Sequence, residues 1–158
     1  MQEPYSIELA ELICASHLRL VGKPLVDPAL SPEDAAIWLY EDAHFCVLAH
    51  DIADDPRFIF ANIAAQRCFE YPWEELLGLP SRLTAEAPNR AERQAMLEAV
   101  AAQGFASGYR GLRIARSGRR FWIENVTVWN LVDADGLNYG QAATYRRISP
   151  HEVPDGRV

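Results

Sequence analysis

The sequence predicts an α+β fold in which an antiparallel sheet packs against helices and is preceded by two further helices. Apolar residues in the first third recur at helical spacing, and two short apolar runs follow within residues 44–61. The last third holds three strand-like segments joined by tight turns. The chain has 158 residues, of which 49% are hydrophobic and 23% charged, and this fits one domain with terminal extensions.

Composition limits the partners of this chain. Its net charge of −7 disfavours nucleic-acid binding, because an acidic surface repels phosphate groups. No apolar run approaches the roughly 18 residues that cross a bilayer, and residues 1–7 lack the features of a signal peptide. We therefore expect a cytoplasmic protein with no nucleic-acid or membrane partner. Its three cysteines, Cys14, Cys46 and Cys68, are expected to be buried small hydrophobes.

The charges are unevenly distributed. Residues 1–43 carry eight acidic and two basic side chains, whereas residues 104–158 carry five acidic and eight basic ones. The acidic segment could pack against the basic one within a chain or between two copies, or both could be solvated faces. Five arginines of the last strands, which could form a basic stripe or a solvated outer face, are Arg113, Arg119, Arg120, Arg146 and Arg147.

Residues 1–43 are predicted to form a helical extension, with helices over 5–21 and 32–42. Gly22 and Pro24 end the first helix, and Ser31 caps the second. The first helix carries two apolar stripes. The main stripe comprises Tyr5, Leu9, Leu12, Ile13 and Leu20, and the second comprises Ile7, Cys14, Leu18 and Val21.

Residues 44–148 are predicted to form the main domain. The apolar runs at 44–49 and 57–61 read as a hairpin. Asn62 caps a helix over 63–70, a helical turn follows at 71–78, and Asn89 with Glu92 forms a capping box that opens a helix ending at Gly104. Turns at 117–118 and 133–136 separate strands over 105–116, 119–132 and 137–148, and residues 149–158 form a tail.

This order of elements resembles the PAS fold, a five-stranded antiparallel sheet with helices across one face. Residues 60–65 (FANIAA), 71–78 (YPWEELLG), 117–124 (SGRRFWIE) and 133–136 (DADG) are similar to PAS motifs and occur in the same order. The chain is more similar still to the MEKHLA family, a PAS-related group, in its stand-alone bacterial form. The stretches that carry this resemblance, which spans residues 8–147, are 80–86 (PSRLTAE), 89–94 (NRAERQ), 118–125 (GRRFWIEN), 127–131 (TVWNL) and 140–144 (GQAAT).

No enzyme, metal or cofactor motif is apparent. The sequence lacks GxSxG, Walker, GxGxxG and HExxH motifs, and its four histidines are isolated. Haem-binding PAS domains usually take a histidine from the helix before the third strand, and residues 89–103 contain none. Light-sensing PAS domains need a cysteine in the segment equivalent to 78–86, which contains none. We expect no cofactor, no metal and a colourless protein.

The PAS resemblance implies a ligand pocket between the sheet and the helices. Alternation along 119–132 offers two faces, and we expect the face of Phe121, Asn125, Thr127 and Trp129 to point inwards, because burying Glu124 of the other face costs more. Whether this face forms an open pocket or a filled core is left open. The residues expected to bind a ligand are Phe121, Asn125, Thr127, Trp129, Gln141, Tyr71 and Trp73, the last two of which could instead simply pack between helix and sheet.

The leading functional hypothesis is a non-catalytic sensory or binding module that recognises a small molecule or a protein partner. One alternative is a small pocket enzyme of the ketosteroid-isomerase or cyclase type, with Asp51, Glu124 or His44 as acid or base. The other is a dimerisation module with a filled core. We expect a homodimer formed through the second stripe, Ile7, Cys14, Leu18 and Val21, unless helix 32–42 of the same chain covers that stripe.

Overall fold

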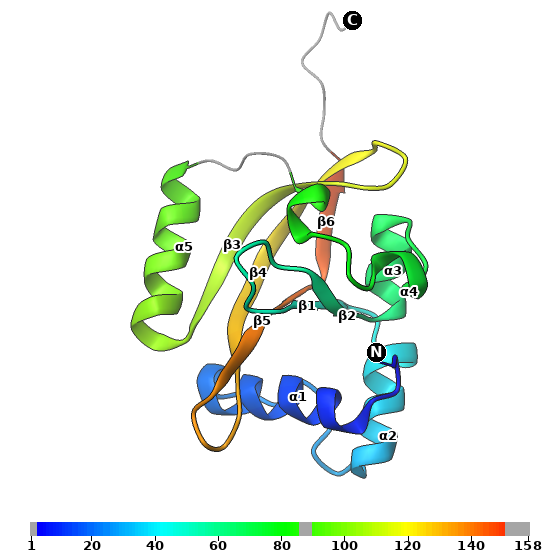
Figure 1. Cartoon of the computed structure of the whole chain (residues 1–158), viewed down its shortest axis with the longest axis vertical. Coiled ribbons are helices and arrows are strands. Elements are labelled where there is room, and N and C mark those ends of the chain that lie inside the picture. Colours follow the sequence, from blue (N-terminus) through cyan, green and yellow to red (C-terminus); the bar gives the residue numbers. More distant parts are fainter. Residues whose placement is uncertain (1–2, 86–89, 151–158) are drawn as a thin grey trace, which may run out of the picture.

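The computed structural model describes residues 3–85 and 90–150, and the predicted Asn89–Glu92 capping box lies outside this description. Its strands form a sheet in the order β2-β1-β5-β4-β3, and β6 also pairs with β4 (Figure 1). All printed pairings are antiparallel, as predicted. The strands are β1 (Cys46–His50), β2 (Phe58–Ala61), β3 (Phe105–Ile114), β4 (Arg120–Val132), β5 (Asn138–Tyr145) and β6 (Arg147–Pro150).

Helices occupy the segments that the sequence predicts. In the N-terminal extension, α1 (Ile7–Val21) is capped by Ser6 and ends at Gly22, while α2 (Pro32–Ile37) is capped by Ser31 and continues into a π-helical turn, η1 (Trp38–Asp42). Between β2 and β3 lie α3 (Ile63–Phe69), α4 (Trp73–Leu76), a 3₁₀ turn η2 (Ser81–Thr84) and α5 (Arg90–Gln103). The two leading helices and the antiparallel sheet are thereby confirmed.

Two compensating bulges interrupt the ladder between β3 and β4. The Cα pairs Ala106↔Val128 and Tyr109↔Val126 imply one extra residue on β3, and the step from there to Gly111↔Ile123 implies one extra residue on β4. The extra residues coincide with positive φ angles of 79° at Gly108 and 53° at Asn125. Beyond its bulge, each strand therefore presents the other set of alternate side chains to a given face of the sheet. The pairing between β3 and β4 then continues in register.

The bulge at Asn125 corrects the predicted inner face. Phe121 and Ile123 do belong to the core cluster on the cavity side of the sheet, but Val126 and Val128 continue that cluster. Trp129 and Leu131 belong instead to the cluster that includes α1. Uninterrupted alternation would have kept all odd-numbered residues of this strand on one face, and one extra residue is enough to exchange the two sets.

The predicted last strand, 137–148, is in fact two strands. β5 pairs with the C-terminal half of β4 and with β1, whereas β6 pairs with the N-terminal half of β4, through Glu124↔Arg147 to Phe121↔Pro150. The break between β5 and β6 falls opposite the bulge at Asn125, since Thr127 pairs with Thr144 on one side of it. A bulge in one strand thus divides its neighbour.

Helices cover both faces of the sheet. α3 and α5 pack on the cavity side, where Ala65, Phe69 and Val100 join the core. α1 lies on the opposite side, against the end of β4 (Figure 1). The N-terminal extension is therefore an integral layer of this domain.

Trp129 anchors α1 to the sheet. Its indole is fully buried and its Nε1 donates to the Ile13 carbonyl at 3.2 Å. One turn further along α1, the Ser16 hydroxyl donates to the Val132 carbonyl and accepts from the Val132 amide, both at 2.9 Å. The His17 ring packs edge-on against Trp129 with centroids 4.7 Å apart. A helix backbone and a strand end are thus joined by directional contacts as well as by packing.

Asn62 joins four segments of the chain, which are η1, the start of β1, the end of β2 where Asn62 itself lies, and α3. Its Oδ1 accepts from the Ala65 amide at 3.1 Å, which confirms the predicted cap of α3, and also from the Val47 amide at 3.0 Å. Its Nδ2 donates to the carbonyls of Leu39 and Phe45, at 3.1 and 2.9 Å. The side chain is fully buried, so each of these partners depends on it for a hydrogen bond that water cannot replace.

We predict that Asn62→Ala lowers the free energy of unfolding by about 3 kcal/mol or more, because it leaves several buried backbone groups unsatisfied. The matched control is Ser31→Ala, which removes one exposed capping bond and should cost about 1 kcal/mol. Urea unfolding of both variants measures the difference. Equal costs would show that the four-segment role assigned to Asn62 is wrong.

His17 should make stability depend on pH. Burial lowers the pKa of its imidazole below the usual 6.5, although a hydrogen bond between Nδ1 and the Lys23 carbonyl, 2.7 Å long, opposes the shift. As pH falls below about 6.5, the unfolded chain takes up this proton before the native chain does, so the native state loses stability.

We therefore expect the free energy of unfolding to fall between pH 7 and pH 5, and to fall less in His17→Gln, which has no titrating ring. Chemical unfolding across this range measures both slopes. The carboxyls with a lowered pKa, those of Glu70 and Asp133, titrate below this window. An identical slope in the variant would contradict the assignment.

Candidate ligand-binding cavity

A cavity of about 670 Å³ lies on the inner face of the sheet, between the strands and the segment that leads from β2 through η2 to α5. Its walls are mainly apolar. They are formed by Leu48, Phe58, Phe69, Met96, Leu97, Ile123, Val126, Val128, Ala142 and Ala143. A volume of this size, lined by apolar side chains with a few polar groups among them, is typical of small-molecule sites.

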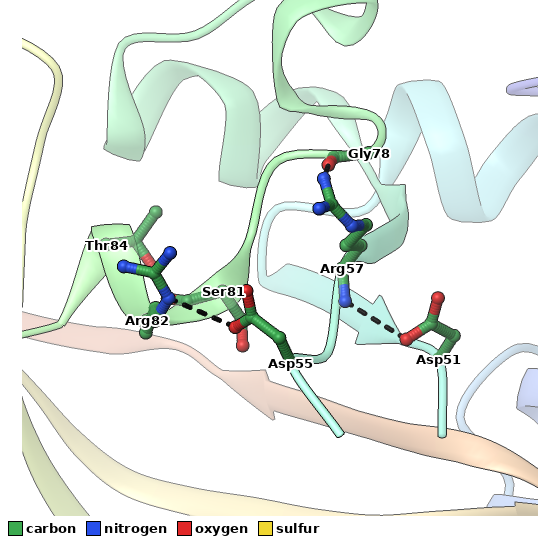
Figure 2. A network of polar contacts seen from close by, with 7 residues as sticks. All are labelled: Asp51, Asp55, Arg57, Gly78, Ser81, Arg82 and Thr84. Carbon is green, nitrogen blue, oxygen red and sulfur yellow. Dashed lines mark hydrogen bonds and ion pairs between the residues drawn. The ribbon is translucent and has the colours of Figure 1, made fainter. Parts of the chain in front are cut away.

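One border of the cavity is held by a polar network between the β1–β2 loop and η2 (Figure 2). Arg82 pairs with Asp55 at 3.1 Å, and the Thr84 hydroxyl donates to the Ser81 carbonyl at 2.8 Å. The backbone amide of Arg57 donates to Asp51 at 3.0 Å in the same network. Because Arg82 and Asp55 are largely exposed, their ion pair positions the loop more than it stabilises the fold.

His50 and Gln141 contribute polar groups to the wall. His50 Nδ1 lies 2.9 Å from the Asp51 carbonyl, which can accept but not donate, so Nδ1 carries the proton and Nε2 of the neutral ring is an acceptor. Gln141 Nε2 donates to Asn130 Oδ1 at 3.4 Å. The neighbouring Gly140 lets β5 pass close to β1, since a Cβ there would lie 2.0 Å from the His50 carbonyl oxygen.

Two thiols and a tyrosine lie beside the cavity. Tyr145, which lines it, donates its hydroxyl to Cys68 Sγ at 3.8 Å, and burial raises the pKa of this hydroxyl well above its usual value. The thiol of Cys46 shares a hydrogen bond with that of Cys68, which raises the pKa of Cys46 and lowers that of Cys68. All three cysteines are free and partly buried. Burial raises the pKa of the Cys14 thiol to about 11.

The predicted ligand-binding residues of β4 and β5 do not gather at one place. Gln141 lines the cavity, and Phe121 packs behind its wall against Phe69, with ring centroids 5.3 Å apart. Asn125 is exposed at the bulge. Thr127 lies on the opposite side of β4, where its hydroxyl is 3.3 Å from that of Ser107, and Trp129 lies beneath α1. The bulge at Asn125 explains why Thr127 and Trp129 lie on the other face of the sheet.

Neither of the two predicted roof aromatics lines the cavity. Trp73 is buried against Tyr40 and Phe60, so the alternative of helix-to-sheet packing holds. Tyr71 is half-buried beside the Arg116 guanidinium, 5.8 Å from its ring centroid. The predicted roof is replaced by η2 and by Met96 and Leu97 of α5.

The acid and base candidates of an enzyme also lie off the cavity wall. Asp51 accepts backbone amides within the β1–β2 loop. Glu124 accepts a hydrogen bond from Ser149, and His44 contacts Arg146 at 3.2 Å. None of the three faces the space in which a substrate would lie.

The predicted dimer stripe of α1 is divided between exposed and covered residues. Ile7 and Leu18 are 38% and 51% exposed, and Tyr5 of the main stripe is 45% exposed. Cys14 and Val21 pack against the core cluster of the same chain, which includes α2 residues. The covering of the stripe by residues 32–42 is therefore partial.

The described residues contain neither a metal-like cluster nor a helix that could span a membrane. In residues 3–85 and 90–150, no three His, Cys, Asp or Glu side chains gather as they would around a metal ion. Within the same residues, every helix is too short or too polar to cross a membrane.

The sequence of this chain matches a known domain family. The sequence model of the MEKHLA domain matches residues 7–150. No curated protein matches the chain significantly.

Among solved structures, an RNA-binding light-oxygen-voltage receptor has 24% identity and a TM-score of 0.61 over 76% of this chain. The matched region is 34% of that receptor, so this chain spans about a third of it. A PAS domain of a protein from Colwellia psychrerythraea has 16% identity and a TM-score of 0.59, covering 73% of this chain and 96% of that one. A light-oxygen-voltage domain studied with a flavin analogue has 14% identity and a TM-score of 0.53, covering 68% and 77%. These similarities show a shared fold.

Proposed function

Because the chain belongs to the MEKHLA domain family, we propose that it is a sensory module that binds a small molecule in the cavity and passes the signal on by association. The main support is the cavity, which leaves about 670 Å³ of mainly apolar space. An interaction module with a filled core would have side chains in this space. The enzyme alternative has less support, because Asp51, Glu124 and His44 all lie off the cavity wall.

We predict that the purified protein retains or takes up a small molecule and that Ala143→Phe, which places a ring in the cavity, abolishes this binding. Thr127→Phe is the matched control, because this substitution adds the same ring on the opposite side of β4. Native mass spectrometry after incubation with a metabolite extract measures the retained mass. A wild-type protein that binds nothing would contradict the proposal.

Flavin is the ligand suggested by one of the structural relatives, the light-oxygen-voltage domain studied with a flavin analogue. Among the residues that the structure describes, the cavity wall contains no cysteine. The thiol that light-sensing PAS domains use to form a flavin adduct is therefore absent from the described wall.

We expect the purified protein to be colourless and to form no light-dependent adduct when flavin mononucleotide is added. Absorption spectra before and after blue-light illumination test this, and a stoichiometric flavin or haem band in the untreated protein would contradict it. A retained colourless molecule would leave the small-molecule proposal intact.

We also propose that two copies associate through α1. The support is that Ile7 and Leu18 stay exposed on a helix whose other face is packed, and that Tyr5 is exposed just before this helix. The acidic extension and the basic last third additionally offer complementary charges to a second copy.

Leu18→Glu should convert the homodimer into a folded monomer. Leu137→Glu, at an equally exposed leucine in the β4–β5 turn, should leave the dimer intact. Light scattering gives the mass and circular dichroism the fold. A dimer that persists in Leu18→Glu would exclude α1 as the contact.

A further inference from the structure

We infer that the cavity takes a small organic anion, whose carboxylate or phosphate group binds Arg113 and Tyr109 while its apolar body lies along β4. This inference rests on the proposed ligand-binding function and specifies the chemical class of the ligand. Both side chains project from β3 into the cavity wall.

Gly111 brings the two side chains together. A Cβ at this position would lie 2.7 Å from a guanidinium nitrogen of Arg113 and 3.1 Å from Cε2 of the Tyr109 ring. Both groups therefore lie over the bare backbone of the residue between them. The result is a cation and a phenol side by side on one wall of a mainly apolar cavity.

The Tyr109 hydroxyl has no hydrogen-bond partner among residues 3–85 and 90–150, although the side chain is only 8% exposed. Buried hydroxyls usually have a partner, because desolvation without a hydrogen bond is costly. Tyr109 also lines a cavity large enough for a ligand. An acceptor atom of a bound molecule would satisfy it.

The two arginines that line the cavity, Arg82 and Arg113, differ in their partners. Within the described residues, Arg82, Arg116 and Arg119 each pair with a carboxylate, at 3.1, 2.9 and 3.0 Å. Arg113 pairs with no described carboxylate, and its contact is a hydrogen bond from Nη1 to the Leu112 carbonyl at 3.0 Å. Several of its five N–H donors are therefore available to an anion, which guanidinium binds in a bidentate manner.

The rest of the cavity suits an apolar ligand body. Ile123, Val126 and Val128 form the β4 wall, and strand register places Arg113 opposite Phe121 at one end and Gln141 opposite Asn130 at the other. Polar groups thus mark the two ends of an apolar wall. This pattern fits an elongated or planar molecule with an acidic group at one end.

Two matched probe pairs test the inference by isothermal titration calorimetry on the full chain. Decanoate against decan-1-ol compares a carboxylate with a neutral head, and flavin mononucleotide against riboflavin compares a phosphate ester with the same ring system uncharged. The variants are Arg113→Gln, Tyr109→Phe and the control Arg110→Gln, which removes an arginine of the same strand that stacks on Trp122 and does not line the cavity. Circular dichroism verifies that each variant is folded.

In at least one pair, the wild-type protein should bind the anion about tenfold or more tightly than its neutral partner. Arg113→Gln should remove this preference, Tyr109→Phe should reduce it severalfold, and Arg110→Gln should leave it unchanged. The pair that shows the preference distinguishes a carboxylate ligand from a phosphate one. Because Tyr109→Phe deletes one oxygen, it tests the inference even where Arg113→Gln does not fold.

Equal binding of both members in both pairs, or a preference that survives both β3 variants, would overturn the inference and leave the small-molecule function standing. If no probe binds and no metabolite is retained, the proposed function itself fails. The two failures are thus distinguishable.

Discussion

The hydrogen bonds of the buried Asn62 amide hold together the segments on which the rest of this domain depends. They connect the end of the N-terminal extension, the first strand and the helix that begins the cavity side. A single side chain can do this because its carbonyl accepts two bonds and its amino group donates two. Its own backbone amide adds a fifth contact, to the Val47 carbonyl at 3.0 Å. The path from β2 into α3 is therefore specified by polar satisfaction inside an apolar core.

A second constraint, the pair of bulges, gives the two faces of the sheet different tasks. On one face Val126 and Val128 line the cavity, and on the other Trp129 and Leu131 receive α1. Without the extra residue at Asn125 these sets would exchange sides relative to Phe121 and Ile123. The cavity and the docking site of the extension thus depend on the same local irregularity in β4.

Polar groups are sparse on the cavity side, and their placement determines what can bind there. Glycine has a direct role in this placement, because Gly111 leaves room for Arg113 and Tyr109, and Gly140 lets β5 pass close to the His50 carbonyl. The close approach of side chains at Gly111 and of backbone at Gly140, rather than turn geometry, explains these two glycines. At the cavity border Arg82 pairs with Asp55, whereas Arg113 has no described carboxylate partner, which makes the β3 pair the inferred site for an external anion.

The sequence by itself determined the elements with local signals. Ser31 and Asn62 cap helices, Gly22 ends one, and the three-strand meander follows from its turn residues, because capping and turn formation involve groups a few residues apart. Family membership also follows from the sequence, because the motifs that indicate it are short stretches of neighbouring residues. The sequence also predicted Gln141 at the site.

Only the tertiary structure decided which side chains share a face and which meet. Asn125 in a left-handed conformation is not distinguishable in the sequence from an ordinary strand asparagine, since the bulge exists only in the pairing with β3. Three features follow from that pairing. They are the division between β5 and β6, the position of Trp129 under α1, and the proximity of the Arg113 and Tyr109 side chains. Contacts between residues more than a hundred positions apart, such as Ser16 with Val132, leave no periodic signal in the chain. They arise when strands align, and alignment depends on long-range packing rather than on local propensity.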